Sequence, residues 1–143
     1  KIGTIFNEQS FLSVLSNDME QATKEILIFS PYLSKGRVSQ MKRLFVTSLQ
    51  QGANVVVFTR SPESFSNASR QKVFDMIADL KNGNVKVIVK ERIHQKFAII
   101  DRRIVWYGSI NLLSYGRSEE SMMRFENREI AEELLMEVEK DIL

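Results

Sequence analysis

A histidine, a lysine, a serine and an asparagine follow one another at short intervals in the second half of the chain, and together they could handle a phosphate group. His94 is the only histidine in the sequence, and Lys96, Ser109 and Asn111 follow it. A neutral imidazole is a nucleophile or a base near physiological pH. An ammonium group binds a phosphoryl oxygen as a point charge, and a hydroxyl and an amide add hydrogen-bond donors. These residue types suit the binding of a phosphate group, with the imidazole beside it as a nucleophile or a base.

Two short β-rich runs carry these residues. Residues two apart in a strand point to the same face, about 6.5 to 7 Å apart. A strand over residues 94–101 would therefore project His94 and Lys96 from one side. A second strand over 103–109 follows so closely that the two should be antiparallel neighbours. All four polar side chains would then converge on one phosphate.

The rest of the chain alternates between helical and strand patterns. Apolar residues at helical spacing, two of the runs ending at glycine, predict helices, and short runs rich in Val, Ile and Phe predict strands. The helices are expected over 10–26, 37–52, 66–83 and 127–143, and further strands over 26–32, 54–60 and 84–90. The segment between 110 and 126 reads as a polar stretch. We therefore predict an α/β fold in one domain, 1–143: an α/β/α sandwich around a mixed, mostly parallel sheet.

The composition of the chain excludes several kinds of site and function. The chain has 143 residues, 43% of them hydrophobic and 27% charged, with a formal net charge of +2. It contains no cysteine and one histidine, which excludes disulfides, thiolate zinc sites and a histidine metal cluster within the chain. We expect neither a metal nor another cofactor. No apolar run approaches the length of a membrane span and no signal-peptide pattern is present, so a cytoplasmic protein without membrane contact is expected. The chain starts at Lys1 and ends in a helical pattern, which suggests a piece of a longer protein.

The spacing of the polar residues resembles the HKD motif of the phospholipase D superfamily. That motif reads His, any residue, Lys, four residues, Asp, six residues, Gly-Ser, any residue, Asn. Every fixed position is filled here, by His94, Lys96, Asp101, Gly108, Ser109 and Asn111. The resemblance implies a phospholipase D-like fold and a metal-independent phosphodiesterase. In that family one histidine attacks phosphorus to give a phosphohistidine, a second protonates the leaving oxygen, and Lys and Asn bind phosphate oxygens.

The chain holds a single copy of the motif, so it supplies half of such an active site. Small nucleases of the family are similar in this respect and complete the site as homodimers, and we expect a homodimer here. The family also places a carboxylate after the motif to orient the histidine. Glu126 is our candidate, with Glu119 and Glu120 as competitors; Glu126 could instead favour the start of the last helix.

Several motif positions have a simpler interpretation. Asp101 differs in parity from His94, so strand geometry favours a structural role for it. Gly108, Ser109 and Asn111 could merely end a strand and shape a turn.

Basic and aromatic residues near the expected strand ends are candidates for substrate binding. Ligands commonly lie at the carboxyl ends of strands in α/β sheets, although an ordinary solvated loop would look the same. The candidates are Tyr32, Lys35, Arg37, Arg60, Arg92 and Arg117, with Arg102, Arg103 and Arg124 as further attractors of a polyanion.

These features favour a nuclease, acting on DNA rather than RNA, as the function. The alternatives are a non-catalytic nucleic-acid-binding module of a larger helicase or restriction protein, and a phospholipid phosphodiesterase. A helicase or another domain of the same parent chain would then be a partner. A lipid enzyme would be expected to carry an amphipathic docking surface, and the sequence shows no clear one.

Overall fold

The computed structural model describes residues 3–115 and 119–142. Within these ranges strands and helices alternate up to residue 90, and three further strands and a final helix follow. The elements are β1 (Gly3–Asn7), α1 (Phe11–Glu20), β2 (Glu25–Phe29), α2 (Lys35–Gln50), β3 (Asn54–Arg60), the 3-10 turn η1 (Pro62–Ser64), α3 (Asn67–Asn82), β4 (Lys86–Lys90), β5 (Lys96–Ile100), β6 (Ile104–Gly108), β7 (Ser121–Glu126) and α4 (Arg128–Ile142).

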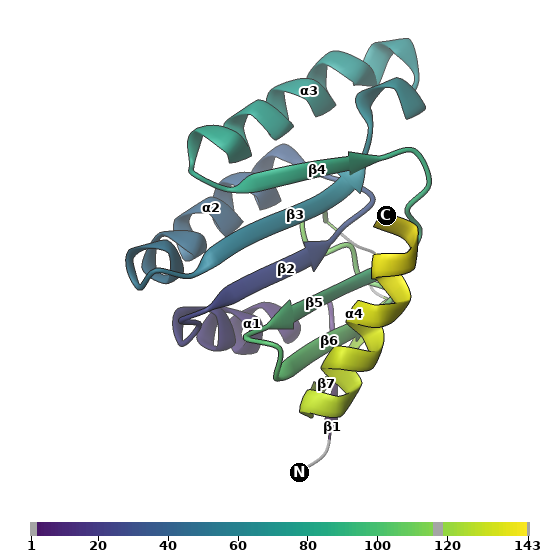
Figure 1. The fold of residues 1–143 in the computed structure, drawn as a ribbon. Coiled ribbons are helices and arrows are strands. Elements are labelled where there is room, and N and C mark those ends of the chain that lie inside the picture. Colours follow the sequence, from purple (N-terminus) through teal and green to yellow (C-terminus); the bar gives the residue numbers. More distant parts are fainter. Residues whose placement is uncertain (1–2, 116–118, 143) are drawn as a thin grey trace.

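The strands form one mixed sheet in the order β1-β7-β6-β5-β2-β3-β4. This confirms the predicted mixed sheet flanked by helices (Figure 1). The pairing differs from the expectation of a mostly parallel sheet. Among the described strands, β2 pairs in parallel with β3 and β3 with β4, whereas β1, β5, β6 and β7 pair antiparallel with their neighbours. The strands β2, β3 and β4, which follow helices α1, α2 and α3, run parallel to one another. β5, in contrast, pairs antiparallel with β2.

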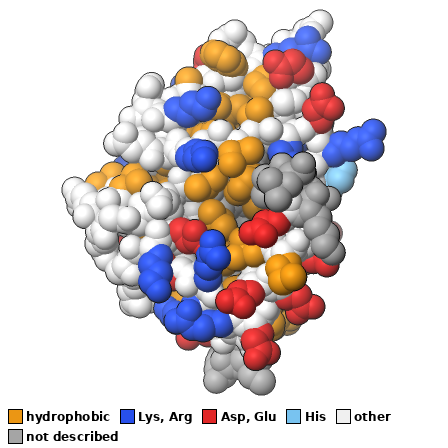
Figure 2. Space-filling view, viewed as in Figure 1, with side chains coloured by type: hydrophobic (Ala, Val, Ile, Leu, Met, Phe, Trp, Pro, Cys, Tyr) orange, Lys and Arg blue, Asp and Glu red, His pale blue; other side chains and the backbone are white. Residues whose placement is uncertain are grey.

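Each face of the sheet has its own hydrophobic core. Residues Val38, Met41 and Phe45 of α2 repeat every three or four positions and are fully buried against the sheet, together with α1 and α3. On the other face α4 is the one helix of the described ranges that packs against the sheet, through Ala131 and Leu135 among others. In Figure 1 α4 crosses only part of this face, and Figure 2 shows a band of hydrophobic side chains beside it.

Two strands were absent from the sequence prediction. β1 is a five-residue strand near the start of the chain, and β7 lies within the stretch that was read as polar. β7 pairs with both β6 and β1. No helix in the described ranges is long and apolar enough to cross a membrane.

Candidate active site

The motif residues other than the aspartate gather at one end of the central strands of the sheet, a region that we call the motif edge. Phe29, the last residue of β2, pairs with Phe97, and Lys96 pairs with Gly108. The carboxyl end of β2, the start of β5 and the end of β6 therefore meet there. Ser109 directly follows β6, so this edge also receives the second half of the motif.

His94 lies in the irregular segment just before β5 rather than in the strand, which corrects the predicted strand over 94–101. Its side chain is exposed and lines a hollow of about 140 Å³ together with Lys90 and Arg92. Lys96 is the first residue of β5, and its Nζ donates a hydrogen bond to the His94 carbonyl oxygen at 3.2 Å. One bond leaves the ammonium group two further N–H donors. The imidazole is thus accessible and has cationic side chains around it.

Gly108 and Ser109 bind the start of β7. A Cβ atom on Gly108 would overlap the Ser121 carbonyl oxygen and crowd the Met122 Cα, so only glycine fits this close approach of two strands. The Ser109 Oγ accepts a hydrogen bond from the Ser121 N–H at 2.9 Å and lies 3.2 Å from the Ser121 carbonyl oxygen. Both residues therefore have a structural role in joining β6 to β7.

Asn111 is tied to the loop that follows β2. Its Oδ1 accepts a hydrogen bond from the Tyr32 backbone N–H at 3.3 Å. The same loop is held by Ser30, whose Oγ accepts from the Leu113 N–H at 3.2 Å and donates to the Tyr32 carbonyl oxygen at 2.8 Å. Because Oδ1 faces the loop, the Nδ2 donors of Asn111 are the part of the amide that can serve a phosphate.

Asp101 lies in the turn at the other end of β5. Its carboxylate accepts hydrogen bonds from the backbone N–H groups of Thr23, Lys24 and Glu25 at 3.1, 2.9 and 3.0 Å. Burial acts most strongly on this group and opposes ionisation, but these three donors and the charge of Arg103 outweigh it and lower the pKa of Asp101. Its carboxylate fixes the start of β2 against the hairpin, which agrees with the structural role expected from its parity.

Glu126 lies at that far end as well. It pairs with Ile104, whereas Met122 pairs with Gly108, so about 13 Å of strand separates Glu126 from the motif edge. The structure therefore does not bring Glu126 to His94 within this chain, which corrects the prediction that it orients the histidine.

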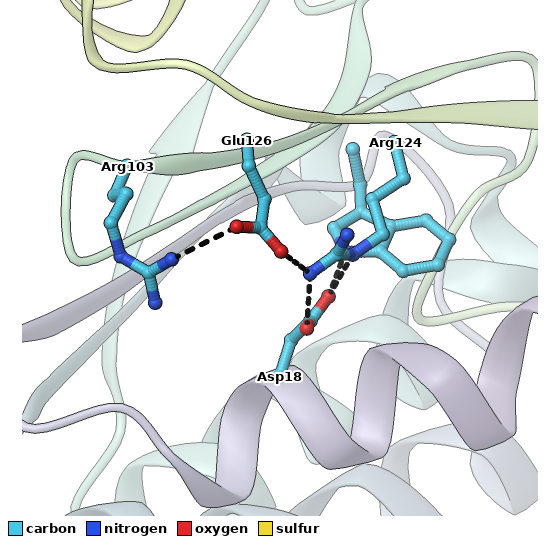
Figure 3. A network of polar contacts seen from close by, with 5 residues as sticks. Asp18, Arg103, Arg124 and Glu126 are labelled. Carbon is cyan, nitrogen blue, oxygen red and sulfur yellow. Dashed lines mark hydrogen bonds and ion pairs between the residues drawn. The ribbon is translucent and has the colours of Figure 1, made fainter. Parts of the chain in front are cut away.

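Two arginines hold Glu126 in a polar network (Figure 3). Arg124 donates to Glu126 at 2.8 Å and Arg103 at 3.4 Å, and these contacts, led by the bond from Arg124, lower the pKa of Glu126. Arg124 also makes two bonds to the buried Asp18, whose Oδ2 accepts from the Trp106 indole N–H at 2.8 Å. These bonds to Asp18, followed by the one to Glu126, raise the pKa of Arg124. The network ties β7 and β6 to α1.

The other carboxylate candidates lie at the motif edge. Glu119 and Glu120 immediately precede Ser121, which is bonded to Ser109. Glu119 is exposed, whereas Glu120 is half-buried and its Oε2 is shielded from solvent. Glu120 is therefore better placed than Glu126 to act near the motif.

Comparison with known proteins identifies the family to which the chain belongs. Residues 15–142 match the family model described as the cardiolipin synthase, PLD-like domain. The chain belongs to the phospholipase D superfamily. This confirms the resemblance seen in the motif. No curated protein matches the chain.

Solved structures of similar fold agree with this assignment. NucT from Helicobacter pylori is 18% identical, with a TM-score of 0.73 over 96% of this chain and 93% of that one. Nuc from Salmonella typhimurium, a phospholipase D family member, is 15% identical, with a TM-score of 0.72 over the same shares. TrmBL2, an archaeal chromatin protein with a novel mode of DNA binding, is 11% identical, with a TM-score of 0.66 over 98% of this chain and 52% of its own. At these identities the likeness concerns the fold.

The basic candidates of this phospholipase D-like domain divide by position. Arg92 lies beside His94 in the hollow, and Lys90, which sequence reasoning did not single out, lies there too. Lys90 ends β4 and pairs with Arg60, the end of β3, so a strand-end rule applied to 84–90 would have found it. Lys35 is exposed at the start of α2 and lines a separate hollow of about 640 Å³ between α2 and α3.

Other residues that were predicted to bind substrate make their contacts away from His94. Arg37 is buried between the rings of Phe11 and Tyr115 rather than exposed in a loop. Arg102 bonds Glu25 at the far end of the hairpin, where Arg103 and Arg124 also lie, so these three do not surround His94. Arg117 lies outside the described residues. Among the described residues, no three His, Asp or Glu side chains are grouped as metal ligands would be.

Asp101→Ala is expected to lower the free energy of unfolding by about 2 to 3 kcal/mol, because three backbone donors lose a charged acceptor. Chemical denaturation measures it. Arg102→Ala is the matched control in the same turn: Arg102 makes an exposed ion pair with Glu25, so the loss should stay within about 0.5 kcal/mol. Equal losses in both variants would contradict the structural role of Asp101.

The effect of Asp101 should also depend on pH. The folded-state pKa of this carboxyl lies below its unfolded value of about 4. Its contribution is therefore complete above the unfolded pKa and is lost as the pH falls through the folded pKa. The difference in unfolding free energy between wild type and Asp101→Ala should shrink progressively as the pH falls below about 5.

Proposed function

We propose that the chain is a metal-independent phosphodiesterase that cleaves nucleic acid, DNA in preference to RNA, through a phosphohistidine on His94. The observation that carries the proposal is a complete motif in a member of this superfamily, with an exposed histidine next to Lys96 and to the cations of the hollow. An accessible imidazole among cations suits attack on a phosphodiester, because the cations attract the anionic substrate and stabilise charge that develops on its oxygens.

In the first step, an imidazole nitrogen of His94 forms a bond to phosphorus while the bond to the leaving oxygen breaks. The leaving oxygen takes a proton from a second imidazole. Lys96 Nζ and Asn111 Nδ2 donate to the non-bridging oxygens, where negative charge increases in the transition state. In the second step, water loses a proton to the second imidazole and attacks phosphorus, and the bond between phosphorus and nitrogen breaks.

The second imidazole must come from another molecule or another part of the parent protein, because the sequence contains one histidine. We propose a homodimer that brings His94 of two subunits to one phosphate. The exposure of His94 at the end of the central strands supports this arrangement, since an exposed residue there can meet its symmetry mate across a two-fold axis. Glu120, rather than Glu126, is the carboxylate that we propose as a positioning residue for the imidazole.

Nucleic acid is the substrate class that the surroundings favour. Lys90 and Arg92 flank His94, and the similar fold of TrmBL2 occurs in a protein described as binding DNA. A phospholipid is the competing substrate, because the matching family model is described as a cardiolipin synthase domain. A non-catalytic nucleic-acid-binding module of a helicase or restriction protein is the other alternative.

The test is an assay with excess chelator on labelled DNA, labelled RNA and phosphatidylcholine vesicles. We expect DNA cleavage to persist at an unchanged rate in chelator, because the histidine needs no metal to attack phosphorus. Adding Mg²⁺ back should not raise the rate. Loss of cleavage on chelation, or cleavage of the lipid alone, would contradict the proposal; DNA binding without cleavage would favour the binding module.

A further inference from the structure

An aromatic ring stands next to the motif and is half open to solvent. Tyr32 follows β2, and its backbone N–H is the group bonded to Asn111 Oδ1. Its exposed fraction is 45%. The ring is therefore carried by the same loop that orients a proposed phosphate ligand.

Two neighbours hold this ring in place. The Arg60 Nη1 donates to the Tyr32 hydroxyl at 2.7 Å, and the guanidinium carbon lies 5.1 Å from the centre of the Tyr32 ring and 4.6 Å from that of Phe65. Phe65 meets Tyr32 edge to face, with ring centres 5.9 Å apart. The Arg60 Nη2 donates to the Ser64 carbonyl oxygen at 3.1 Å. Arg60, expected to bind substrate, thus braces the tyrosine.

The backbone beneath the ring is fixed as well. Ser30 donates its N–H to the Phe58 carbonyl oxygen at 3.0 Å, and the Thr59 Oγ1 donates to the Pro31 carbonyl oxygen at 3.3 Å. With the bonds that Ser30 Oγ makes, both sides of the loop are anchored. An exposed ring with so little freedom loses little entropy when another flat group stacks on it.

We infer that Tyr32 is a stacking platform for an unpaired nucleobase next to the phosphate that His94 attacks. The inference rests on the proposed function and names its substrate more closely as single-stranded nucleic acid. Every base has a π-face, so stacking tolerates any sequence but requires a base that is free of its partner. A phosphate held by Asn111 would have its neighbouring base within reach of a ring on the adjoining loop. The positive charge of Arg60 beside the ring adds attraction for the nucleic-acid backbone.

The experiment compares a fluorescein-labelled oligodeoxyadenosine with an abasic oligomer of the same length, in chelator, by fluorescence anisotropy. All proteins carry His94→Ala so that no substrate is consumed. We expect the reference protein to bind the oligodeoxyadenosine about tenfold more tightly than the abasic strand. Adding Tyr32→Leu should remove most of this difference, whereas Tyr32→Phe, which keeps the ring, should retain it.

Phe74→Leu is the matched control, because Phe74 is an exposed aromatic residue on α3 away from the motif edge. It should leave both affinities unchanged, and thermal melting should show that all variants are folded. Equal binding of the two strands by the reference protein, or a Tyr32→Leu variant that still prefers the base-bearing strand, would overturn the inference. The proposed function fails separately, if the protein with His94 intact cleaves neither strand.

Discussion

His94→Ala should lower the rate of nucleic-acid cleavage by at least about 10⁴-fold, because the variant lacks both the nucleophile and the acid of the proposed cycle. His94 is exposed and precedes β5, so the fold should lose no more than about 0.5 kcal/mol. Single-turnover rates on labelled DNA and a denaturation curve measure the two effects. A trapped phosphohistidine in acid-quenched wild type, absent from the variant, would identify the nucleophile directly.

Asp101→Ala provides the opposite result within the same motif. It should lose stability and keep its rate at temperatures where it remains folded, because Asp101 bonds the backbone at the start of β2 rather than the substrate.

Retention of more than about a hundredth of the wild-type cleavage rate by His94→Ala would contradict the role of His94 as nucleophile.

Mixing wild-type protein with His94→Ala should suppress activity, since a heterodimer retains one imidazole for a cycle that needs two. With about a ninefold excess of the variant, random pairing leaves about one tenth of the wild-type subunits in homodimers. Activity per wild-type subunit should therefore fall about tenfold once subunits have exchanged. The measurement is the cleavage rate after incubation at a concentration and temperature that allow exchange.

The control is the same mixture assayed at once, before exchange, which should keep full activity. A fully active monomer at nanomolar concentration would contradict the shared site. So would a crystal structure in which the two His94 side chains face separate clefts.

The sequence predicted the helices and the inner strands because their patterns are local. The spacing of Val38, Met41 and Phe45 indicates a helix without knowledge of its neighbours, and the continuous apolar run of β3 indicates a buried strand. β7 was missed because its strand pattern includes Arg124 and Glu126. Arg124 is bonded to Asp18, which is remote in sequence, and Glu126 is bonded to Arg124 and Arg103, so the local pattern carries no sign of Asp18.

The same omission explains why Glu126 was the candidate for the carboxylate that orients the histidine. β7 runs antiparallel to β6, so it starts beside Gly108 and carries each later residue farther from the motif edge. Glu126 therefore ends up opposite Ile104, and the residues before Ser121 remain near the motif. Without β7, spacing along the chain could not distinguish Glu120 from Glu126. The motif itself was predictable because its six fixed positions lie close together in the sequence, in and around the hairpin of β5 and β6.

The hydrogen bonds of Asp101 indicate which motif residues would be kept if selection for catalysis were lost. A lineage that kept a binding role and abandoned catalysis could lose His94 and Lys96 without harm to its architecture. It could not as readily lose Asp101, on which three backbone N–H groups depend, or Gly108, where a side chain would collide with the next strand. A motif with its aspartate and glycine intact and its histidine replaced should therefore mark descendants that keep the fold but have lost the proposed phosphodiesterase activity.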